Sequence, residues 1–286
     1  MKTLQDKVVL ITGAGHGLGL ETARQFAAAG AVVLISDLNA ERVSNAVEEL
    51  AQDELQVAGY VMDVTDPADV RMTRERILRE HGPISVLVNN AGIVSGGDFA
   101  DIPLQKHLMT VDVNTNGPII VTHTFLPDLL TQAESALVNI ASASALIALP
   151  NAASYAASKW GVLGFTDSLR EELKLSGQRN LTVTSICPSY ITTGMFHGVK
   201  APLLVPLLTP QWLAERIVHC VQKKREQLLA PSLVSLLPLA KATWPRFLFR
   251  RLLAFLGVYQ SMDKWKGHAE APEVPALAPE AARVAS

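Results

Sequence analysis

Residues 8–19 read Val-Val-Leu-Ile-Thr-Gly-Ala-Gly-His-Gly-Leu-Gly, a short apolar run that passes directly into a glycine-rich turn. β-Branched apolar runs of this length are typical of strands buried on both faces of a parallel sheet. Glycines in a turn between such a strand and a helix let the backbone approach a phosphate closely. The spacing is T-G-x-x-x-G-x-G rather than the G-x-G-x-x-G of most dinucleotide folds. We expect a phosphate-binding turn here, with a merely tight turn as the alternative.

Further strand-like runs follow this one, separated by stretches in which apolar residues recur every three or four positions. The expected strands are residues 8–12, 31–36, 57–62, 85–89, 136–141, 181–186 and 227–230. The clearest helical stretches are residues 18–29, 40–51, 68–81 and 153–176. This alternation predicts an α/β fold: a single-domain, doubly wound (Rossmann-type) parallel seven-stranded sheet with helices on both faces.

The composition is that of a globular protein. Of the 286 residues, 49% are hydrophobic and 18% are charged, which is unlike a disordered chain. The formal net charge of −2 provides no global basic field, so we expect no nucleic-acid partner. Cys187 and Cys220 lie in apolar runs, which predicts buried thiols rather than a disulfide or a metal site. No metal is expected, and a reducing compartment fits.

The sequence changes character after residue 231, which divides the chain into three expected parts. Residues 1–231 are expected to form the dinucleotide-binding catalytic domain. Residues 232–266 are apolar and basic with several prolines, which predicts a broken helical extension. Residues 267–286 are rich in Ala, Pro and Glu without periodicity, and we expect a disordered tail. The sequence shows neither a secretory signal nor a stretch apolar enough for a confident membrane span, so we expect a cytoplasmic or peripheral membrane protein.

Two acidic residues follow expected strands and bear on the cofactor. Asp37 closes the second strand, where a carboxylate can accept hydrogen bonds from the hydroxyls of an adenosine ribose and repel a 2′-phosphate. Leu38 stands where an arginine would accommodate that phosphate, so NAD is favoured over NADP. Alternatively, Asp37 is the N-cap of a helical segment that begins at Asn39. Asp63 could hydrogen-bond the adenine amino group, or only shape a turn.

Tyr155 and Lys159 form Y-x-x-x-K on an expected helix. The i, i+4 spacing places the phenol and the ammonium on one face. A phenol, with a reference pKa of about 10, is a poor base at neutral pH, and a nearby cation stabilises the phenolate. The pair therefore suits general acid/base chemistry. Such a doublet alone is weak evidence, and neighbouring motifs must support it.

Three polar positions support this pair. Ser142 ends the expected strand 136–141, at the edge where doubly wound sheets bind ligands, and its hydroxyl can orient a substrate oxygen. Ser144 is a nearby competitor for that role, and either serine could instead be a satisfied turn residue. Asn-Asn-Ala-Gly at 89–92 ends the fourth strand. Asn114 lies further along the chain, where its amide can hold a water or brace a strand.

In this order, the motifs resemble the short-chain dehydrogenase/reductase family over residues 7 to about 231. The motifs are T-G-A-G-H-G-L-G, Asp63, N-N-A-G, Asn114, Ser142, Tyr155-Ala-Ala-Ser-Lys159 and Cys187-Pro188. The resemblance implies that Tyr155 is the general acid/base, that Lys159 lowers its pKa and binds the nicotinamide ribose, and that Ser142 positions the reacting oxygen. It further implies that Asn114 supports a proton-relay water, and that no metal is required.

The resemblance also implies a set of cofactor contacts, with Thr193 at the nicotinamide carboxamide. The expected cofactor-binding residues are Gly13, Gly15, His16, Gly17, Leu18, Gly19, Asp37, Asp63, Val64, Asn90, Ala91, Gly92, Tyr155, Lys159, Pro188, Ile191 and Thr193. Ser189 departs from the family pattern, which usually has glycine at this place, so we expect the loop beside the nicotinamide to differ in shape.

The variable segments after two strands bear on the substrate. Residues 143–154 and 190–210 are strongly apolar and offer few groups that recognise charge. A hydrophobic alcohol or ketone is therefore the expected small-molecule partner. The alternative is that these side chains only pack the loops against the domain.

Residues 232–259 combine Leu and Phe with scattered basic residues. The three- and four-residue spacing of apolar side chains is typical of an interfacial helix; they are Trp244, Leu248, Leu252, Phe255 and Tyr259. Contact with an anionic membrane surface, a lid on the substrate pocket and a dimer contact are all open alternatives. Together with the order of the motifs, this C-terminus resembles the retinol and 17β-hydroxysteroid dehydrogenase branch, although the N-terminal anchor common in that branch is not seen.

These observations predict an NAD-dependent oxidoreductase that transfers a hydride between a hydrophobic alcohol or ketone (a steroid, a retinoid or a long-chain compound) and the nicotinamide cofactor. The alternatives are a general carbonyl reductase and a catalytically idle nucleotide-binding regulatory protein at a membrane surface. We expect a homo-oligomer, either a dimer or a tetramer.

Overall fold

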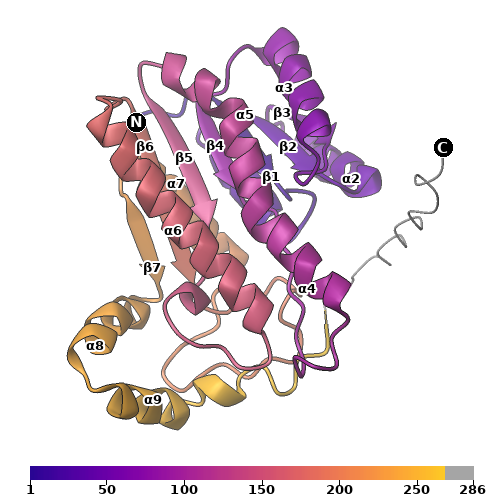
Figure 1. Cartoon of the computed structure of the whole chain (residues 1–286). Coiled ribbons are helices and arrows are strands. Elements are labelled where there is room, and N and C mark those ends of the chain that lie inside the picture. Colours follow the sequence, from indigo (N-terminus) through magenta and orange to yellow (C-terminus); the bar gives the residue numbers. More distant parts are fainter. Residues whose placement is uncertain (268–286) are drawn as a thin grey trace, which may run out of the picture.

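The expected strands form one seven-stranded parallel sheet in a computed structural model that describes residues 1–267 (Figure 1). The strands are β1 (Val8–Thr12), β2 (Val32–Asp37), β3 (Val57–Val61), β4 (Val86–Asn89), β5 (Ser135–Ile140), β6 (Leu181–Pro188) and β7 (Gln227–Ala230). Their order is β3-β2-β1-β4-β5-β6-β7, which confirms the doubly wound prediction. The expected tail at 267–286 lies outside the described residues, apart from Gly267 itself.

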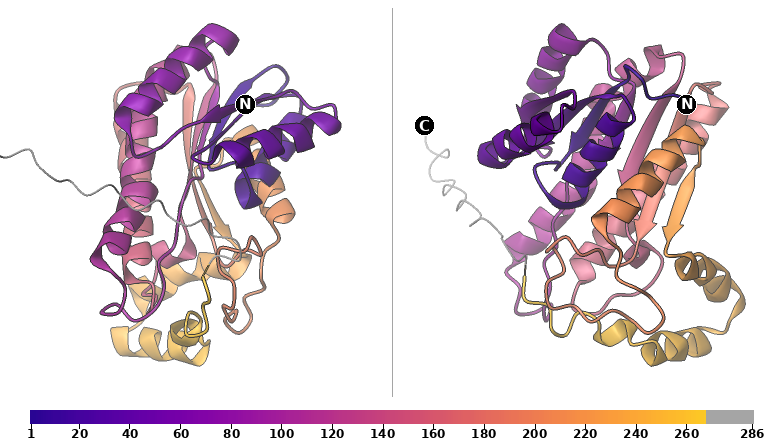
Figure 2. Two further views of the ribbon diagram at one scale, coloured as in Figure 1. Left: turned by 90° about the vertical axis from the view of Figure 1, so that its right-hand side faces the viewer. Right: turned by 180° about the vertical axis from the view of Figure 1, so that it is seen from behind.

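Helices cover both faces of the sheet (Figure 2). They are α1 (Gly17–Ala28), α2 (Ala40–Gln52), α3 (Pro67–His81), α4 (Leu104–Val111), α5 (Gly117–Thr131), α6 (Ala153–Leu175) and α7 (Pro210–Gln222). One hydrophobic cluster joins α1, α2 and α7 to one face, and a second cluster joins α3, α5 and α6 to the other. Successive residues of β1 serve the two clusters in turn: Val9 and Ile11 belong to the first, and Leu10 to the second.

Side-chain caps explain where several helices begin. Asn39 caps α2 by accepting a hydrogen bond from the Arg42 amide, and Asp66 caps α3 ahead of Pro67. The N-cap residue of α1, His16, makes no side-chain cap bond within residues 1–267. The first-turn amides of α1 therefore remain suited to an anionic ligand at the carboxyl edge of the sheet.

The C-terminal segment lies across the carboxyl ends of the strands, at the bottom of Figure 1. It contains a 3₁₀ turn (Ser232–Leu236), α8 (Leu237–Thr243), α9 (Arg246–Phe255) and a second 3₁₀ turn (Val258–Gln260). Pro245 separates α8 from α9, as the prolines predicted. The domain boundary at residue 231 stays a prediction. Within the described part of the chain, no helix has both the length and the hydrophobicity that a membrane crossing needs.

The spacing that runs from Trp244 to Tyr259 does not form one helical stripe. Trp244 precedes α9 and Tyr259 follows it, because the chain breaks at both ends of this short helix. Phe249 and Leu253 are the side chains that α9 buries, whereas Leu248 and Phe255 remain exposed. The expected interfacial stripe is therefore wrong as a single helix face, although several of its members do lie on the outer surface.

Candidate active site

The expected cofactor residues meet in one cleft at the carboxyl edge of the sheet, where the strand order reverses between β1 and β4. All of them line this cleft except Gly15, which lies behind it against Asp37. The volume of the cleft is about 940 Å³, within the upper range for cofactor pockets. Thr193 lies beside Gly17 in this lining, since a Cβ at Gly17 would lie 3.4 Å from the Cβ of Thr193.

Close backbone packing explains the glycines of the turn. A Cβ at Gly13, where φ is +61°, would lie 2.6 Å from the Cα of Ala91. A Cβ at Gly19 would lie 2.4 Å from the carbonyl oxygen of Gly13 and 2.6 Å from Nδ2 of Asn90. No larger side chain fits at either place without moving the turn. The turn is thus pressed against the end of β4, and its amides border the cleft.

The N-N-A-G segment fastens the end of β4 to the glycine turn. Asn90 donates from Nδ2 to the carbonyl oxygens of Thr12 and Gly13, both at 2.9 Å. In return, the Thr12 hydroxyl accepts hydrogen bonds from the backbone amides of Asn90 and Ala91. The side chain of Asn90 is therefore engaged with the protein backbone, while the residue still borders the cleft.

Asp37 lines the cleft at the end of β2. Its Oδ2 accepts from the Gly15 amide at 3.2 Å, and its Oδ1 accepts from the Asn39 amide at 3.1 Å. Asn39, not Asp37, supplies the cap of α2, so the capping alternative for Asp37 is wrong. Arg42 also lines the cleft, with its Cβ against Gly15. We did not single out Arg42 from the sequence, where only its position in the first turn after the Asn39 cap could have indicated it.

Asp63 shapes the turn that follows β3. Its Oδ1 accepts from the Thr65 amide and hydroxyl, at 2.8 and 2.7 Å. The backbone amide of Asp63 donates to Asp69 at 2.7 Å. Asp63 therefore does shape a turn. Because Asp63 and Val64 also line the cleft, this structural role is compatible with a contact to adenine.

Asn114 lies fully buried in a π-helical turn, residues Asp112–Asn116, between α4 and α5. Its Oδ1 accepts from the Ile93 amide at 2.8 Å, and its Nδ2 donates to the Ile93 carbonyl at 2.9 Å and to the Ser158 hydroxyl at 3.0 Å. These bonds brace the loop after β4 against α6. Single-turn π-bulges are frequent at functional sites, and here the bulge points the amide inward. The relay role of Asn114 stays a prediction.

Tyr155 lies buried in the first turn of α6 and Lys159 in the second, on one face of the helix as their spacing predicted. Burial raises the pKa of Tyr155 above its usual value, and the hydrogen bond with the Ser142 side chain lowers it in part. Burial also lowers the pKa of Lys159 to about 8. The Lys159 ammonium donates to the Ile140 carbonyl at 2.8 Å and lies 5.8 Å from the centre of the Tyr155 ring. A cation is thus close to the phenol ring.

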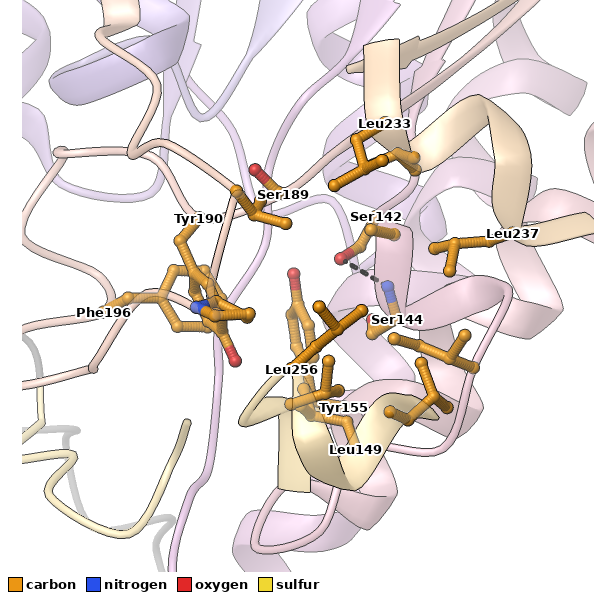
Figure 3. A pocket seen from close by; sticks show the side chains of 17 residues that line it. Ser142, Ser144, Leu149, Tyr155, Ser189, Tyr190, Phe196, Leu233, Leu237 and Leu256 are labelled. Carbon is orange, nitrogen blue, oxygen red and sulfur yellow. Dashed lines mark hydrogen bonds between the residues drawn. The ribbon is translucent and has the colours of Figure 1, made fainter. Parts of the chain in front are cut away.

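Ser142, rather than Ser144, is the serine beside the phenol. The Tyr155 hydroxyl points toward Ser142 (Figure 3), and Ser142 accepts from the Ser144 amide at 3.1 Å. The hydroxyl of Ser144 is buried without a hydrogen-bond partner among the described residues. The same holds, within residues 1–267, for the hydroxyl of Ser189, the residue that replaces the family's glycine.

A second, apolar cavity lies on the other side of Tyr155 (Figure 3). The loops after β5 and β6 supply part of its wall, through Ile147, Leu149, Phe196 and Val205. The C-terminal segment supplies another part. This arrangement corresponds to a lid on the substrate pocket, one of the three alternatives considered for this segment from the sequence. The segment contributes Leu233, Val234, Leu237, Leu253, Leu256 and Val258. Leu203 and Leu204, which belong to the apolar segment 190–210, are exposed instead of lining this cavity.

The residues present fit a dinucleotide. The crowded glycine backbone and the α1 N-terminus suit a pyrophosphate, and the Asp37 carboxylate suits the ribose beside it. Lys159 and Tyr155 border the far end of the same cleft. Both cysteines are buried and unpaired. In the part of the chain that the structure describes, no group of three or more His, Cys, Asp or Glu side chains could hold a metal.

Comparison with known proteins agrees with this geometry. The family model described as short chain dehydrogenase matches residues 7–203. The chain is 32% identical to epidermal retinol dehydrogenase 2 of Mus musculus over 93% of its length and 87% of that protein. It is 31% identical to retinol dehydrogenase 10 of Bos taurus, with 91% and 85% covered. The crystal structure of gox2181 superposes with a TM-score of 0.71 at 28% identity, covering 78% of this chain and 91% of that one.

Members of this family are oxidoreductases that act on CH–OH groups with a nicotinamide cofactor. The match covers the glycine turn, Asp37, Asn114, Ser142, and the tyrosine and lysine of α6. The chain therefore belongs to the short-chain dehydrogenase family and, within it, resembles the retinol dehydrogenase branch.

Proposed function

We propose that the chain is an NAD-dependent dehydrogenase of hydrophobic alcohols of steroid, retinoid or long-chain type. One observation carries this proposal: Tyr155 lines both the polar cleft and the apolar cavity, together with Ser142, Ser189 and Phe196. A proton-transferring phenol at the junction of a dinucleotide cleft and an apolar cavity suits a substrate whose reacting oxygen is its polar end.

The residues at this junction have separable tasks. A bound nicotinamide ring supplies the hydride acceptor. Ser142 donates a hydrogen bond to the substrate oxygen, and Tyr155 takes the hydroxyl proton as the carbonyl forms. In the reductive direction Tyr155 returns that proton to the oxygen. Since burial raises the pKa of Tyr155, the phenolate needs a cation, and Lys159 is the cation beside it. Asn114 positions α6 through its bond to Ser158.

The preference for NAD rests on Asp37. Its carboxylate lies at the end of β2, against the Gly15 amide, and would repel a 2′-phosphate. Arg42 in the same cleft is the feature that favours NADP. We keep NAD because Asp37 is buried beside the turn and its negative charge is close to the ribose position. We also propose membrane contact through residues 232–259 and assembly into a homo-oligomer, neither of which depends on the cofactor or the substrate.

The test uses purified full-length protein with NAD and a series of steroid, retinoid and aliphatic alcohols. We expect turnover with hydrophobic alcohols, tighter binding of NAD than of NADP, and a loss of about 10³-fold in kcat for Tyr155→Phe with unchanged NAD binding. Tyr155→Phe removes only the hydroxyl, so the fold of the pocket should persist. Full activity in this variant would contradict the mechanism, and tighter binding of NADP would contradict the role of Asp37.

A further inference from the structure

The C-terminal segment from the first 3₁₀ turn to the end of α9, residues 232–255, forms a hood with two different faces. Its inner face closes the apolar cavity through Leu237 and Leu253. The Lys241 ammonium holds it to the domain, since it donates to the Leu146 carbonyl at 3.0 Å and lies 4.0 Å from the centre of the Trp160 ring. Because these contacts hold the inner face against the domain, the opposite face of the hood points away from it.

That outer face is apolar and aromatic. On α9, Phe247, Arg251 and Phe255 follow one another at i, i+4 and i+8, opposite the buried pair Phe249 and Leu253. Phe247 and Phe255 are 60% and 76% exposed. Other exposed large hydrophobic residues lie on the hood and on the loop packed beside it: Leu203, Leu204, Leu207, Leu236, Leu239, Trp244 and Leu248. Such a patch on a monomeric surface marks an interaction site.

The charged residues of the hood and of the neighbouring loop have one sign. From 227 to 262, the sequence contains no Asp or Glu, and none occurs from 173 to 214, which includes the neighbouring loop. Arg246, Arg250 and Arg251 are all exposed on α9. The chain as a whole is slightly acidic, with a net charge of −2, so this local excess of arginine is not a property of the general surface. Aromatic side chains interleaved with arginine suit the interface of an anionic bilayer.

We propose that the outer face of the hood docks on an anionic lipid bilayer, so that the cavity receives its hydrophobic substrate at the membrane surface. The delivery of substrate rests on the proposed function, whereas the docking does not. A second copy of the chain fits this face less well. A two-fold contact through α9 would bring the arginines of both copies together, and like charges would then oppose association.

The experiment measures flotation of the full chain with vesicles of phosphatidylcholine alone and of phosphatidylcholine with phosphatidylglycerol. We expect flotation with the anionic vesicles only, weakened by salt. The variant Phe247→Glu/Phe255→Glu should lose it. The matched control is Met72→Glu/Leu175→Glu, which adds two charges at exposed hydrophobic positions on α3 and at the far end of α6. It should float like the wild type.

A second pair of variants tests the charge. Arg246→Gln/Arg250→Gln/Arg251→Gln should lower the partition coefficient about 100-fold. The control Arg71→Gln/Arg79→Gln/Arg179→Gln removes the same amount of charge from other exposed positions and should leave the partition coefficient unchanged. Equal flotation of the phenylalanine variant and the wild type would overturn the proposal, as would a lipid-free dimer that this variant converts to monomer. Turnover of a short water-soluble alcohol without vesicles is the separate readout for the proposed function, and we expect it to be unchanged in all four variants.

Discussion

The polar cleft and the apolar cavity meet at Tyr155, but they are built in different ways. The part of the cleft around the glycine turn is made of backbone and short polar groups at the ends of β1, β2 and β4, where Asn90 and the turn hold one another in place. The cavity is made of apolar side chains from loops and from the C-terminal hood. A rigid backbone site suits a cofactor that is always the same. A wall of Leu, Ile and Val recognises size and shape, and this suits a substrate with one polar end.

The two regions should therefore respond differently to mutation. Damage to the cleft should weaken cofactor binding whatever the substrate is. Substitutions in the cavity should reduce activity by an amount that depends on the size of the substrate, and they should not change the affinity for the cofactor. Tyr155 belongs to both regions and Lys159 lines the cleft beside it, so the effect of burial on Lys159 can be measured in the protein without cofactor or substrate.

Gly19→Ala should have the largest effect. The new Cβ would meet the Gly13 carbonyl at 2.4 Å and the Asn90 amide at 2.6 Å, so the turn and the end of β4 must separate. We expect cofactor binding about 100-fold weaker, measured by fluorescence titration, because the pyrophosphate depends on these amides. The control is Gly164→Ala in α6, whose Cβ would meet nothing within 4 Å in the described structure. Equal cofactor affinity in both variants would mean that the crowded turn does not hold the cofactor.

Leu253→Ala should affect only the cavity. Leu253 is buried against Ile147 and Phe249, and its truncation enlarges the space that holds the substrate. We expect kcat/KM to fall about tenfold for large hydrophobic alcohols, since about 1.4 kcal/mol of contact is lost, with little change for short ones. Cofactor affinity should stay the same. Leu248→Ala, which truncates an exposed leucine of the same helix, is the control. A uniform loss over all alcohols would show that the hood supports the fold rather than the substrate.

The sequence was sufficient to predict the sheet and the cleft, because both depend on local patterns. The strands are β-branched runs, and parallel strands bring their carboxyl ends to one edge, so residues at strand ends could be assigned to one site. The role of Arg42 escaped this reasoning, since its place in the cleft depends on how α2 packs beside the glycine turn. The cap of α2 at Asn39 depends on the residue at which β2 ends, and the pattern of apolar residues does not define a strand end to one residue.

The cavity could be predicted only as apolar. Its walls join residues far apart in the chain, as the packing of Leu253 with Ile147 shows. The orientation of α9 was the harder problem, because apolar side chains occur all around this helix. Both a stripe through Leu248 and Phe255 and a stripe through Phe249 and Leu253 are consistent with helical spacing. Only packing against Ile147 decides which one is buried.

The smallest predicted effect concerns Lys159, which lines the cleft beside Tyr155. Burial lowers its pKa to about 8, so the folded protein without cofactor releases this proton earlier than the unfolded chain does. Where the unfolded state holds more protons, stability rises with pH. The free energy of unfolding should therefore increase by about 1 kcal/mol between pH 7 and pH 9 through this group. Tyr155 adds almost nothing in this window, because its phenol is neutral in the unfolded chain, where its pKa is about 10, and burial raises that pKa further in the folded protein.

The variant Lys159→Met isolates this contribution. Burial also raises the pKa of Cys187 to about 12, and that thiol lowers stability as the pH rises over the same window. The pH dependence of the wild type alone therefore mixes two opposite slopes. Urea unfolding of both proteins at pH 7 and pH 9 should show that the wild type gains about 1 kcal/mol relative to Lys159→Met. A difference of zero would mean that the ammonium is already solvated in the free protein, and that binding of the cofactor, rather than folding, buries it beside Tyr155.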